Sequence, residues 1–320
     1  MTVLILAREI EPQVDRVVEE LSGRDVPVFR TDLAAFPQTL VLDARLGPAG
    51  WDGTLATERR CVRLRDIRSV WYRHPAHFKF PEGMSRPERR HAAAEARVGV
   101  AGVLCSLDVL WVNYPSRESD ALKPRQLDVA RRCGLRVPQT LITNSPVGIR
   151  DFAAVVGGPL AGKNLSAASM VESGHIQTAY TRQLESTDLA DLSGVATTAH
   201  LFQKFIDDKA FEVRVTVVGE RMFAAAIHAK SDAARIDFRA DYPSLDYSVV
   251  EPPPLIRDGM LAFMRAFDLV FGAFDFAVTT GGEWIMFECN PFGQYGWLED
   301  ALDLPITSAL ADVLQSGARL

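Results

Sequence analysis

The chain has 320 residues, of which 48% are hydrophobic and 24% are charged, so it can bury a sizeable core and is long enough for two or three domains. Its net charge of −6 gives no general attraction to nucleic-acid phosphates, and no local basic stripe offsets that charge, so we expect no nucleic-acid partner. The sequence has no apolar run of about 18 residues and no signal peptide, which favours a cytoplasmic protein without a membrane partner.

The first third of the chain opens as a βαβ unit. The expected elements are a strand at residues 2–7, a helix at 12–25, strands at 26–30, 39–46 and 69–74, and a long amphipathic helix at 86–107. No G-x-G-x-x-G fingerprint follows the first strand, which argues against a Rossmann cofactor there.

The remaining pattern mixes strands and covering helices. We expect one helix from Ser116 to Gly134, a strand at 140–143, strands with short turns at 158–165, 174–184, 200–206, 211–219 and 220–229, a helix at 253–270, strands at 271–280 and 283–290, and a closing helix at 305–316. This mixture predicts an α/β or α+β fold. The expected domains are residues 1–115, 116–200 and 201–320.

Four cysteines are scattered along the chain, at Cys61, Cys105, Cys133 and Cys289. No two of them form a C-x-x-C pair, which argues against a zinc site and against a disulfide framework. We therefore expect buried free thiols.

The segment FDFAVTTGGEWIMFECN predicts a β-hairpin, because two glycines at 281–282 supply a turn between apolar strands. If Thr279 pairs with Trp284 across a four-residue loop, Asp275 falls opposite Glu288 on the same face. Carboxylates inside such apolar strands would be costly to bury without a cation.

A cation site is the functional interpretation of this hairpin. Glu288 and Asn290 project from one face of their strand because residues i and i+2 do so, and Asp275 joins them from the partner strand. Carboxylate and amide oxygens suit Mg²⁺, which binds phosphate oxygens of a substrate at the same time. The alternative is that both acids are solvated or paired with arginines.

Cationic residues that could hold those phosphates lie upstream. Lys163 ends the segment GPLAGK, and Lys123 lies near the start of a predicted helix, although a lone lysine is ordinarily a surface residue. The strand end at Gln203, Lys204, Phe205 and Ile206 is a candidate for nucleotide binding, because its backbone could bind an adenine edge.

Glu212 and Arg214 alternate onto one face of the following strand. A carboxylate there can accept from ribose hydroxyls, and an arginine can clamp a phosphate or a carboxylate. The alternative is an exposed ion pair on an ordinary antiparallel sheet.

The order of Lys123, VPQT, Lys163, QKFI, FEVR, Asp275 and FECNPFG resembles the ATP-grasp ligases. The segments SVWYRHP and NPFGQYGWLEDALDLPITSALADVL resemble most closely the branch that installs ω-ester and ω-amide crosslinks in ribosomal peptides, the microviridin-type or graspetide synthetases. The resemblance implies an ATP-grasp fold with a pre-ATP-grasp βαβ domain, a central domain and a C-terminal antiparallel-sheet domain.

The same resemblance implies ATP and Mg²⁺ as cofactors and a precursor peptide, with leader and core, as partner. It also implies a homodimer, and a methyltransferase that modifies the product in some systems. By this resemblance the nucleotide and metal contacts are Lys123 and Lys163 for phosphates, Gln203 to Ile206 for adenine, Glu212 for ribose, and Asp275, Glu288 and Asn290 for two Mg²⁺ ions.

Two positions depart from the pattern of that branch. His74 stands where the branch commonly has a second arginine after Arg73, which puts a basic contact at neutral pH in doubt. The loop after Lys163 is poor in glycine, and Ser166 and Ser169 are expected to cover the phosphates instead.

The chemistry expected from these residues is conversion of a carboxylate to an acyl phosphate, which a nucleophile of the same peptide then displaces. Arg214 and Arg239 are the candidates for stabilising the developing negative charge. Arg73 is the candidate for holding the acceptor carboxylate at the edge of the cleft, and His74 is a second candidate for binding the substrate. Two alternatives stay open: a ligase that joins small substrates, and an ATP-binding module without turnover.

Overall fold

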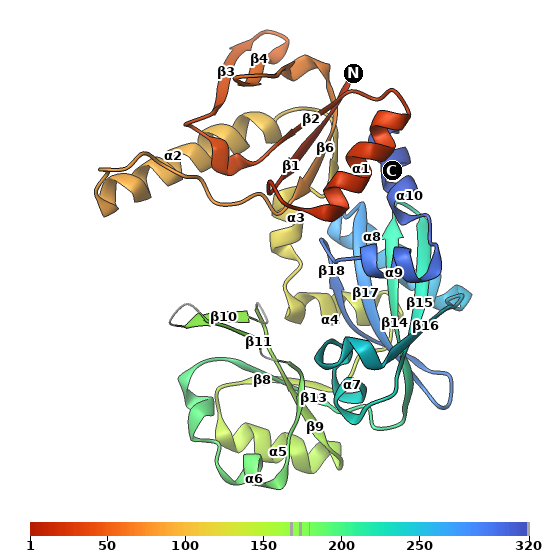
Figure 1. Ribbon diagram of the computed structural model, residues 1–320. Helices are drawn as coiled ribbons and strands as arrows, with labels where there is room; N and C mark the ends of the chain where they lie inside the picture. Colours follow the sequence, from red (N-terminus) through yellow and green to blue (C-terminus); the bar gives the residue numbers. More distant parts are fainter. Residues whose placement is uncertain (167–168, 173–174, 179, 319–320) are drawn as a thin grey trace.

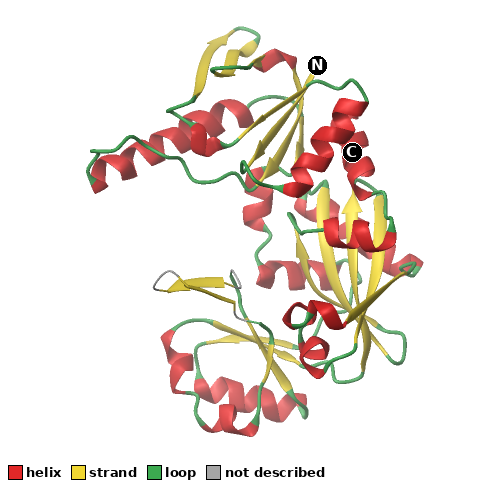
Figure 2. Cartoon of the chain, in the orientation of Figure 1, coloured by secondary structure: helices red, strands yellow, loops and turns green. Residues whose placement is uncertain are grey.

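The computed structural model describes residues 1–166, 169–172, 175–178 and 180–318, and the side chains of residues 167–179 lie outside the description. Strands and helices alternate along the chain and form a mixed α/β fold with five sheets among the described residues (Figures 1 and 2). No helix in this part of the chain is long and apolar enough to cross a membrane.

The N-terminal part is built on a parallel sheet in the order β2-β1-β6-β7. Its elements are β1 (Thr2–Ala7), α1 (Pro12–Gly23), β2 (Val28–Thr31), β3 (Leu40–Gly47), β4 (Gly50–Thr57), β5 (Cys61–Arg63), β6 (Ile67–Arg73), α2 (Arg86–Cys105) and β7 (Leu110–Val112). A separate antiparallel sheet, β3-β4-β5, extends from this core.

Both faces of the parallel sheet are covered, which explains the continuous apolar run of β1. Val3 and Ile5 face a core shared with α1 and with the C-terminal helix α10 (Ile306–Ser316). Leu4 and Leu6 face the opposite core, which contains α2 and the small antiparallel sheet. Elements from the two ends of the sequence therefore share one hydrophobic core, and Figure 1 shows α10 beside α1.

The connection to the second part consists of two helices, α3 (Pro115–Asp120) and α4 (Lys123–Arg132), so the prediction of one helix from Ser116 to Gly134 is wrong. Pro124 explains the break, because it has no N–H to continue an incoming helix and is tolerated only in a first turn.

The central part holds a four-stranded antiparallel sheet in the order β12-β9-β13-β8. Its elements are β8 (Thr140–Thr143), α5 (Pro146–Val156), β9 (Leu160–Lys163), β10 (Ser169–Glu172), β11 (His175–Thr178), β12 (Arg182–Gln183), α6 (Ser186–Ala190) and β13 (His200–Lys204). Helix α5 was not predicted, although Ser145 caps it by accepting from the Gly148 N–H and Gly157 ends it in a left-handed conformation.

The C-terminal part holds a five-stranded antiparallel sheet in the order β16-β15-β14-β17-β18. Its elements are β14 (Lys209–Val218), β15 (Arg221–Ala229), α7 (Asp232–Ile236), β16 (Leu245–Val249), α8 (Pro254–Phe267), β17 (Phe271–Thr279), β18 (Trp284–Asn290), α9 (Gly296–Leu302) and α10. Helix α8 packs its buried face, Met260, Phe263, Met264 and Phe267, against this sheet and leaves the opposite sheet face for polar side chains. The short elements α7, β16 and α9 were not predicted.

The β17–β18 hairpin is present, but its pairing near the turn differs from the prediction by one residue. Val278, and not Thr279, pairs with Trp284. A β-bulge at Phe287 inserts one extra residue, and after it Asp275 pairs with Glu288 as predicted.

The four cysteines are all free. The expectation that they are buried is wrong for Cys61, which is exposed because β5 lies in the small outer sheet. Cys289 is buried, while Cys105 and Cys133 are partly exposed.

Candidate functional site

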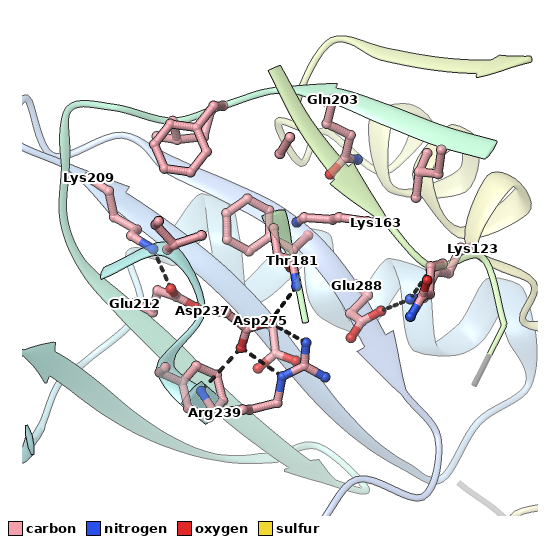
Figure 3. Close-up of a pocket in the computed structure, with 18 of the residues that line it drawn as sticks. Lys123, Lys163, Thr181, Gln203, Lys209, Glu212, Asp237, Arg239, Asp275 and Glu288 are labelled. Atoms are coloured by element: carbon pink, nitrogen blue, oxygen red, sulfur yellow. Dashed lines mark hydrogen bonds and ion pairs between the residues drawn. The ribbon is translucent and has the colours of Figure 1, made fainter. Parts of the chain in front are cut away.

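A pocket lies between β13 and the polar face of the C-terminal sheet (Figure 3). The predicted nucleotide, catalytic and metal residues all line it: Lys123, Lys163, Gln203, Lys204, Phe205, Ile206, Glu212, Arg214, Arg239, Asp275, Glu288 and Asn290. These residues come from α4, β9, β13, β14, the segment after α7, β17 and β18. The fold therefore collects side chains that are up to about half the chain apart in sequence.

The acids on β17 and β18 each face a cation from another element. Arg214 on β14 binds Asp275 bidentately, with Nε–Oδ1 and Nη2–Oδ2 distances of 2.7 and 3.1 Å. Lys123 Nζ lies 3.0 Å from Glu288 Oε2. Asn290 Nδ2 donates to both carboxylates, at 3.3 Å to Asp275 and 3.4 Å to Glu288, so the three predicted ligands converge.

Strand order explains this convergence. β17 lies between β14 and β18, and Asp275 is the cross-strand partner of Arg214 on one side and of Glu288 on the other. The bulge turns both Phe287 and Glu288 toward the pocket, while Met286 and Cys289 pack in the core beneath.

The two carboxylates differ in their electrostatic surroundings. Burial raises the pKa of Asp275, and the Glu288 charge adds to this rise although the Arg214 guanidinium opposes it. Burial also acts to raise the pKa of Glu288, but the Lys123 and Lys163 ammonium groups outweigh it and hold that pKa below its usual value. Glu288 is therefore the more firmly ionised of the pair.

The donor set fits a hard cation. Mg²⁺ is commonly held by one or two carboxylates together with substrate phosphates, and this pocket offers two adjoining carboxylates with an amide between them. No group of three or more His, Cys, Asp or Glu side chains suited to a metal occurs among the described residues. Mg²⁺ held by two carboxylates usually completes its coordination with water and with substrate phosphates.

Lys163 lies at the end of β9 with its ammonium group 3.7 Å from the centre of the Phe287 ring. Burial lowers the pKa of Lys163 to about 8, although the charges of Glu288 and Glu212 act in the opposite direction. A partly buried ammonium group whose desolvation is only partly offset by nearby acids is suited to bind an incoming phosphate.

The strand end at Gln203–Ile206 presents a limited set of backbone groups to the pocket. The Lys204 N–H donates to Gln139 O at 2.9 Å and the Phe205 N–H donates to Pro159 O at 2.9 Å, so both amides are already used. The Ile206 N–H has no partner among the described residues, and the buried Gln203 Oε1 has none either. The Ile206 N–H and the Gln203 Oε1 are therefore two groups at this edge of the pocket that have no partner among the described residues.

Glu212 lies further along the same wall and forms an ion pair with Lys209. Burial raises the pKa of Glu212, and the Lys209 ammonium opposes this rise. Lys209 was not predicted as a site residue. Residues three apart do not share a face in a regular strand, and Lys209 reaches Glu212 only because the strand is irregular between Lys209 and Phe211.

Arg239 is held by Asp237, with an Nε–Oδ1 distance of 2.8 Å. The other carboxylate oxygen of Asp237 accepts from the Thr181 N–H at 2.9 Å, so one buried acid connects the central sheet with the segment that carries Arg239 (Figure 3). Sequence reasoning missed Asp237. The signal that could have found it is its position two residues before the arginine.

Arg73 and His74 do not line the pocket. Arg73 is 2% exposed, donates to Gln13 Oε1 at 2.6 Å, and donates to the backbone carbonyl of Phe292. The expected position of Arg73 at the edge of a cleft is therefore wrong, because Trp71 and Arg73 share a fully buried strand face. His74 lies edge-on to the Phe292 ring, and burial lowers its pKa. Substrate binding by either residue stays a prediction.

Of the two serines predicted to cover the phosphates, only Ser166 has a described side chain. Ser166 is exposed and follows β9 by three residues. The side chain of Ser169, and residues 167–168 and 173–174 of the same loop, lie outside the described residues.

Comparison with known proteins supports the fold of each part. The family model described as the MvdD pre-ATP grasp domain matches residues 2–119. A search of curated protein sequences finds no significant match.

Solved structures match over the whole chain. The macrocyclase MdnC of Microcystis aeruginosa MRC, crystallised with the precursor peptide MdnA, is 29% identical with a TM-score of 0.85, over 99% of this chain and 100% of that chain. A ribosomal-peptide-associated ATP-grasp ligase of Chryseobacterium gregarium, in complex with ADP and with leader and core peptides, is 26% identical with a TM-score of 0.89, over 100% and 99% of the two chains. The ATP-grasp ligase PsnB, complexed with a minimal precursor, Mg and ADP, is 23% identical with a TM-score of 0.77, over 98% and 96%, which shows the fold alone.

These likenesses extend from the parallel sheet through the pocket to α10. The predicted mixed α/β architecture is thereby confirmed. The chain has the ATP-grasp fold preceded by a pre-ATP-grasp domain, and the predicted resemblance to the ATP-grasp macrocyclases of ribosomal peptides is confirmed.

Proposed function

We propose that this protein is an ATP-dependent ligase that activates Asp or Glu side chains of a ribosomal precursor peptide and joins them to Ser or Thr hydroxyls, or to Lys amines, of the same peptide. The observation that carries the proposal is a single pocket that combines two adjoining carboxylates with Lys123, Lys163, Arg214 and Arg239. The proposed cofactors are ATP and Mg²⁺, and similar structures contain ADP, or ADP with Mg.

Nucleotide binding is assigned to the wall formed by β9, β13 and β14. The Ile206 N–H can donate to an adenine ring nitrogen, and the carbonyls of the same segment can accept from its amino group. In this proposal Glu212 accepts from ribose hydroxyls and the partly buried Lys163 ammonium binds phosphate oxygens, because both side chains line the pocket.

Mg²⁺ would be held by Asp275, Glu288 and Asn290, where it supplies charge neutralisation and alignment for phosphoryl transfer. In the first step a peptide carboxylate oxygen attacks the γ-phosphorus of ATP and ADP leaves. In the second, a hydroxyl or amine attacks the acyl carbon, loses its proton, and inorganic phosphate leaves. We assign Arg214 and Arg239, which both line the pocket, to stabilising the negative charge that develops on the phosphoryl oxygens.

Isotope transfer tests this mechanism directly. A candidate precursor peptide with ¹⁸O in its Asp and Glu side chains is incubated with the protein, ATP and Mg²⁺. Acyl phosphate formation requires that each crosslink delivers one ¹⁸O atom to the released phosphate, which mass spectrometry of the phosphate detects. Crosslinked peptide with unlabelled phosphate would contradict the mechanism. The predicted homodimer and methyltransferase partner stay predictions.

A further inference from the structure

A buried polar clamp holds the backbone around the proposed metal ligands. Three side chains, Arg73, Asn113 and Gln126, bind backbone groups in the segment 289–292, which directly follows Glu288 and includes Asn290. All three are buried, with exposed fractions of 2%, 1% and 4%. None of the three lines the nucleotide pocket.

Gln126 on α4 fixes the residue between the two ligands. Its Oε1 accepts from the Cys289 N–H at 2.7 Å, and its Nε2 donates to the Cys289 carbonyl at 2.9 Å. A side-chain amide that satisfies both groups of one residue leaves that residue little rotational freedom.

Asn113 and Arg73 act on the other side of Asn290. Asn113 Nδ2 donates to the Pro291 carbonyl at 2.7 Å, and Arg73 donates to the next carbonyl, that of Phe292. Asn113 also binds the first residue of β17, since its Oδ1 accepts from the Phe271 N–H at 2.9 Å and its Nδ2 donates to the Phe271 carbonyl at 2.9 Å.

The positions of these residues follow from the N-terminal sheet. β6 and β7 are parallel neighbours, so Arg73 at the end of β6 and Asn113 directly after β7 emerge at the same sheet edge. That edge meets the loop after β18, and the pre-ATP-grasp domain therefore contacts the strands that carry Asp275 and Glu288.

We propose that Arg73 and Asn113 are positioning residues, which hold the backbone around Asn290 so that the carboxyl edge of the N-terminal sheet sets the geometry of the cation site. This inference rests on the proposed function for the identity of the cation. Arg73 is a costly residue to bury, because its Nε has no partner and burial lowers its pKa. A residue that served stability alone would be better replaced by an apolar side chain.

The test compares Arg73→Met and Arg73→Lys with a matched control, Ser69→Ala. Ser69 lies on the same strand, is buried, and its Oγ donates at 2.8 Å to the Leu314 carbonyl of α10, which is remote from the clamped segment. All three variants thus alter a buried hydrogen bond from β6 to a distant backbone carbonyl. Only the Arg73 variants alter the one near Asn290, and they also alter the hydrogen bond to Gln13 Oε1 and the 3.8 Å ion pair with Glu11.

Two measurements are made on each protein. Amide hydrogen exchange of the metal-free protein is followed in peptides that cover residues 287–294, and calorimetry measures Mg²⁺ binding to the ADP complex. Arg73→Met should exchange more than about tenfold faster in this segment and bind Mg²⁺ more than about tenfold more weakly, while its affinity for ADP without Mg²⁺ stays as in the wild type. Arg73→Lys should give an exchange rate and a Mg²⁺ affinity between those of the wild type and Arg73→Met, because a lysine can donate to one carbonyl. If Arg73→Met does not fold, the comparison is made with Arg73→Lys alone.

Unchanged exchange and unchanged Mg²⁺ affinity in the Arg73 variants would overturn the positioning role, as would equal changes in Ser69→Ala. Failure of the proposed function has a different signature. A wild-type protein that binds ADP and Mg²⁺ but never modifies a peptide would contradict that function and leave the positioning result intact.

Discussion

Single residues in this pocket are arranged as pairs of opposite charge. Arg214 binds Asp275, Lys123 binds Glu288, and Lys209 binds Glu212. Buried charges are tolerated because each has such a partner, and a bound cation and phosphates can take the place of those partners. Lys163 differs, since it contacts an aromatic ring and its nearest opposite charges only partly offset its burial.

The lowered pKa of Lys163 predicts that nucleotide affinity depends on pH. Below about 8 the ammonium form is present in the free protein and can bind phosphate, whereas above that value binding must first take up a proton. We expect the affinity for ADP without Mg²⁺ to fall several-fold between about pH 7 and about pH 9. Calorimetry at the two pH values measures this change.

Lys163→Arg provides the control for this prediction, because a guanidinium stays charged across the whole range. The variant should lose the pH dependence whatever its absolute affinity. A wild-type affinity that is constant between the two pH values would show that Lys163 does not contact the phosphates as an ammonium group.

Glu288 is the acid whose charge the pocket preserves most strongly. Glu288→Gln keeps the size of the side chain and removes that charge, so ATP turnover should fall by more than about 100-fold while the fold persists. Glu283→Gln is the matched control, because Glu283 lies at the turn of the same hairpin and pairs with Arg136 at the surface. Steady-state ADP release measures both, and comparable turnover in the two variants would remove Glu288 from the site.

Two of the pocket residues could be recognised from the cost of burying their charge. Asp275 and Glu288 stand out because a carboxylate inside an apolar strand is costly, and this cost can be judged from neighbouring residues alone. Asp237 and Asn113 did not stand out, because their roles depend on partners 56 and 158 residues away in sequence. Local patterns carry no information about such contacts.

At the scale of elements, the β-bulge at Phe287 decides which side chains reach the pocket. The predicted pairing of Asp275 with Glu288 is correct, although the pairing assumed at the turn is shifted by one residue. No sequence pattern in this strand predicts the bulge. Its extra residue, Phe287, cancels the one-residue shift at the turn and so restores the predicted pairing. The start of helix α4 could have been predicted from the sequence, because Pro124 is typical of the first turn of a helix.

Close packing beneath the loop after β18 gives a test at this scale. Gly293 is buried, and an added Cβ would collide with the Cβ of Ala273 on β17. Gly293→Ala should therefore lower the free energy of unfolding by about 1–3 kcal/mol. Gly158→Ala, where no atom lies within 4 Å of the added Cβ, is the control. Urea denaturation measures both, and equal stability of the two variants would contradict the packing described here.

At the scale of the whole molecule, the polar face of the C-terminal sheet and the carboxyl edge of the N-terminal sheet meet at one segment. The mixed α/β class and the order of the main strands followed from apolar periodicity. The packing of α10 on the N-terminal sheet did not, because an amphipathic helix does not specify which apolar surface covers it. The division at residues 115 and 200 stays a prediction.

The central claim is that this pocket forms crosslinks within a peptide at the expense of ATP. Mass spectrometry of an acidic, hydroxyl-rich precursor peptide tests it, after incubation with the protein, ATP and Mg²⁺ and in parallel with Glu288→Gln. The wild type should remove one water from the peptide for each crosslink and release one ADP with it, and the variant should leave the peptide unchanged. Steady ADP release by the wild type with no loss of water from any such peptide would contradict the claim and favour a ligase of small substrates.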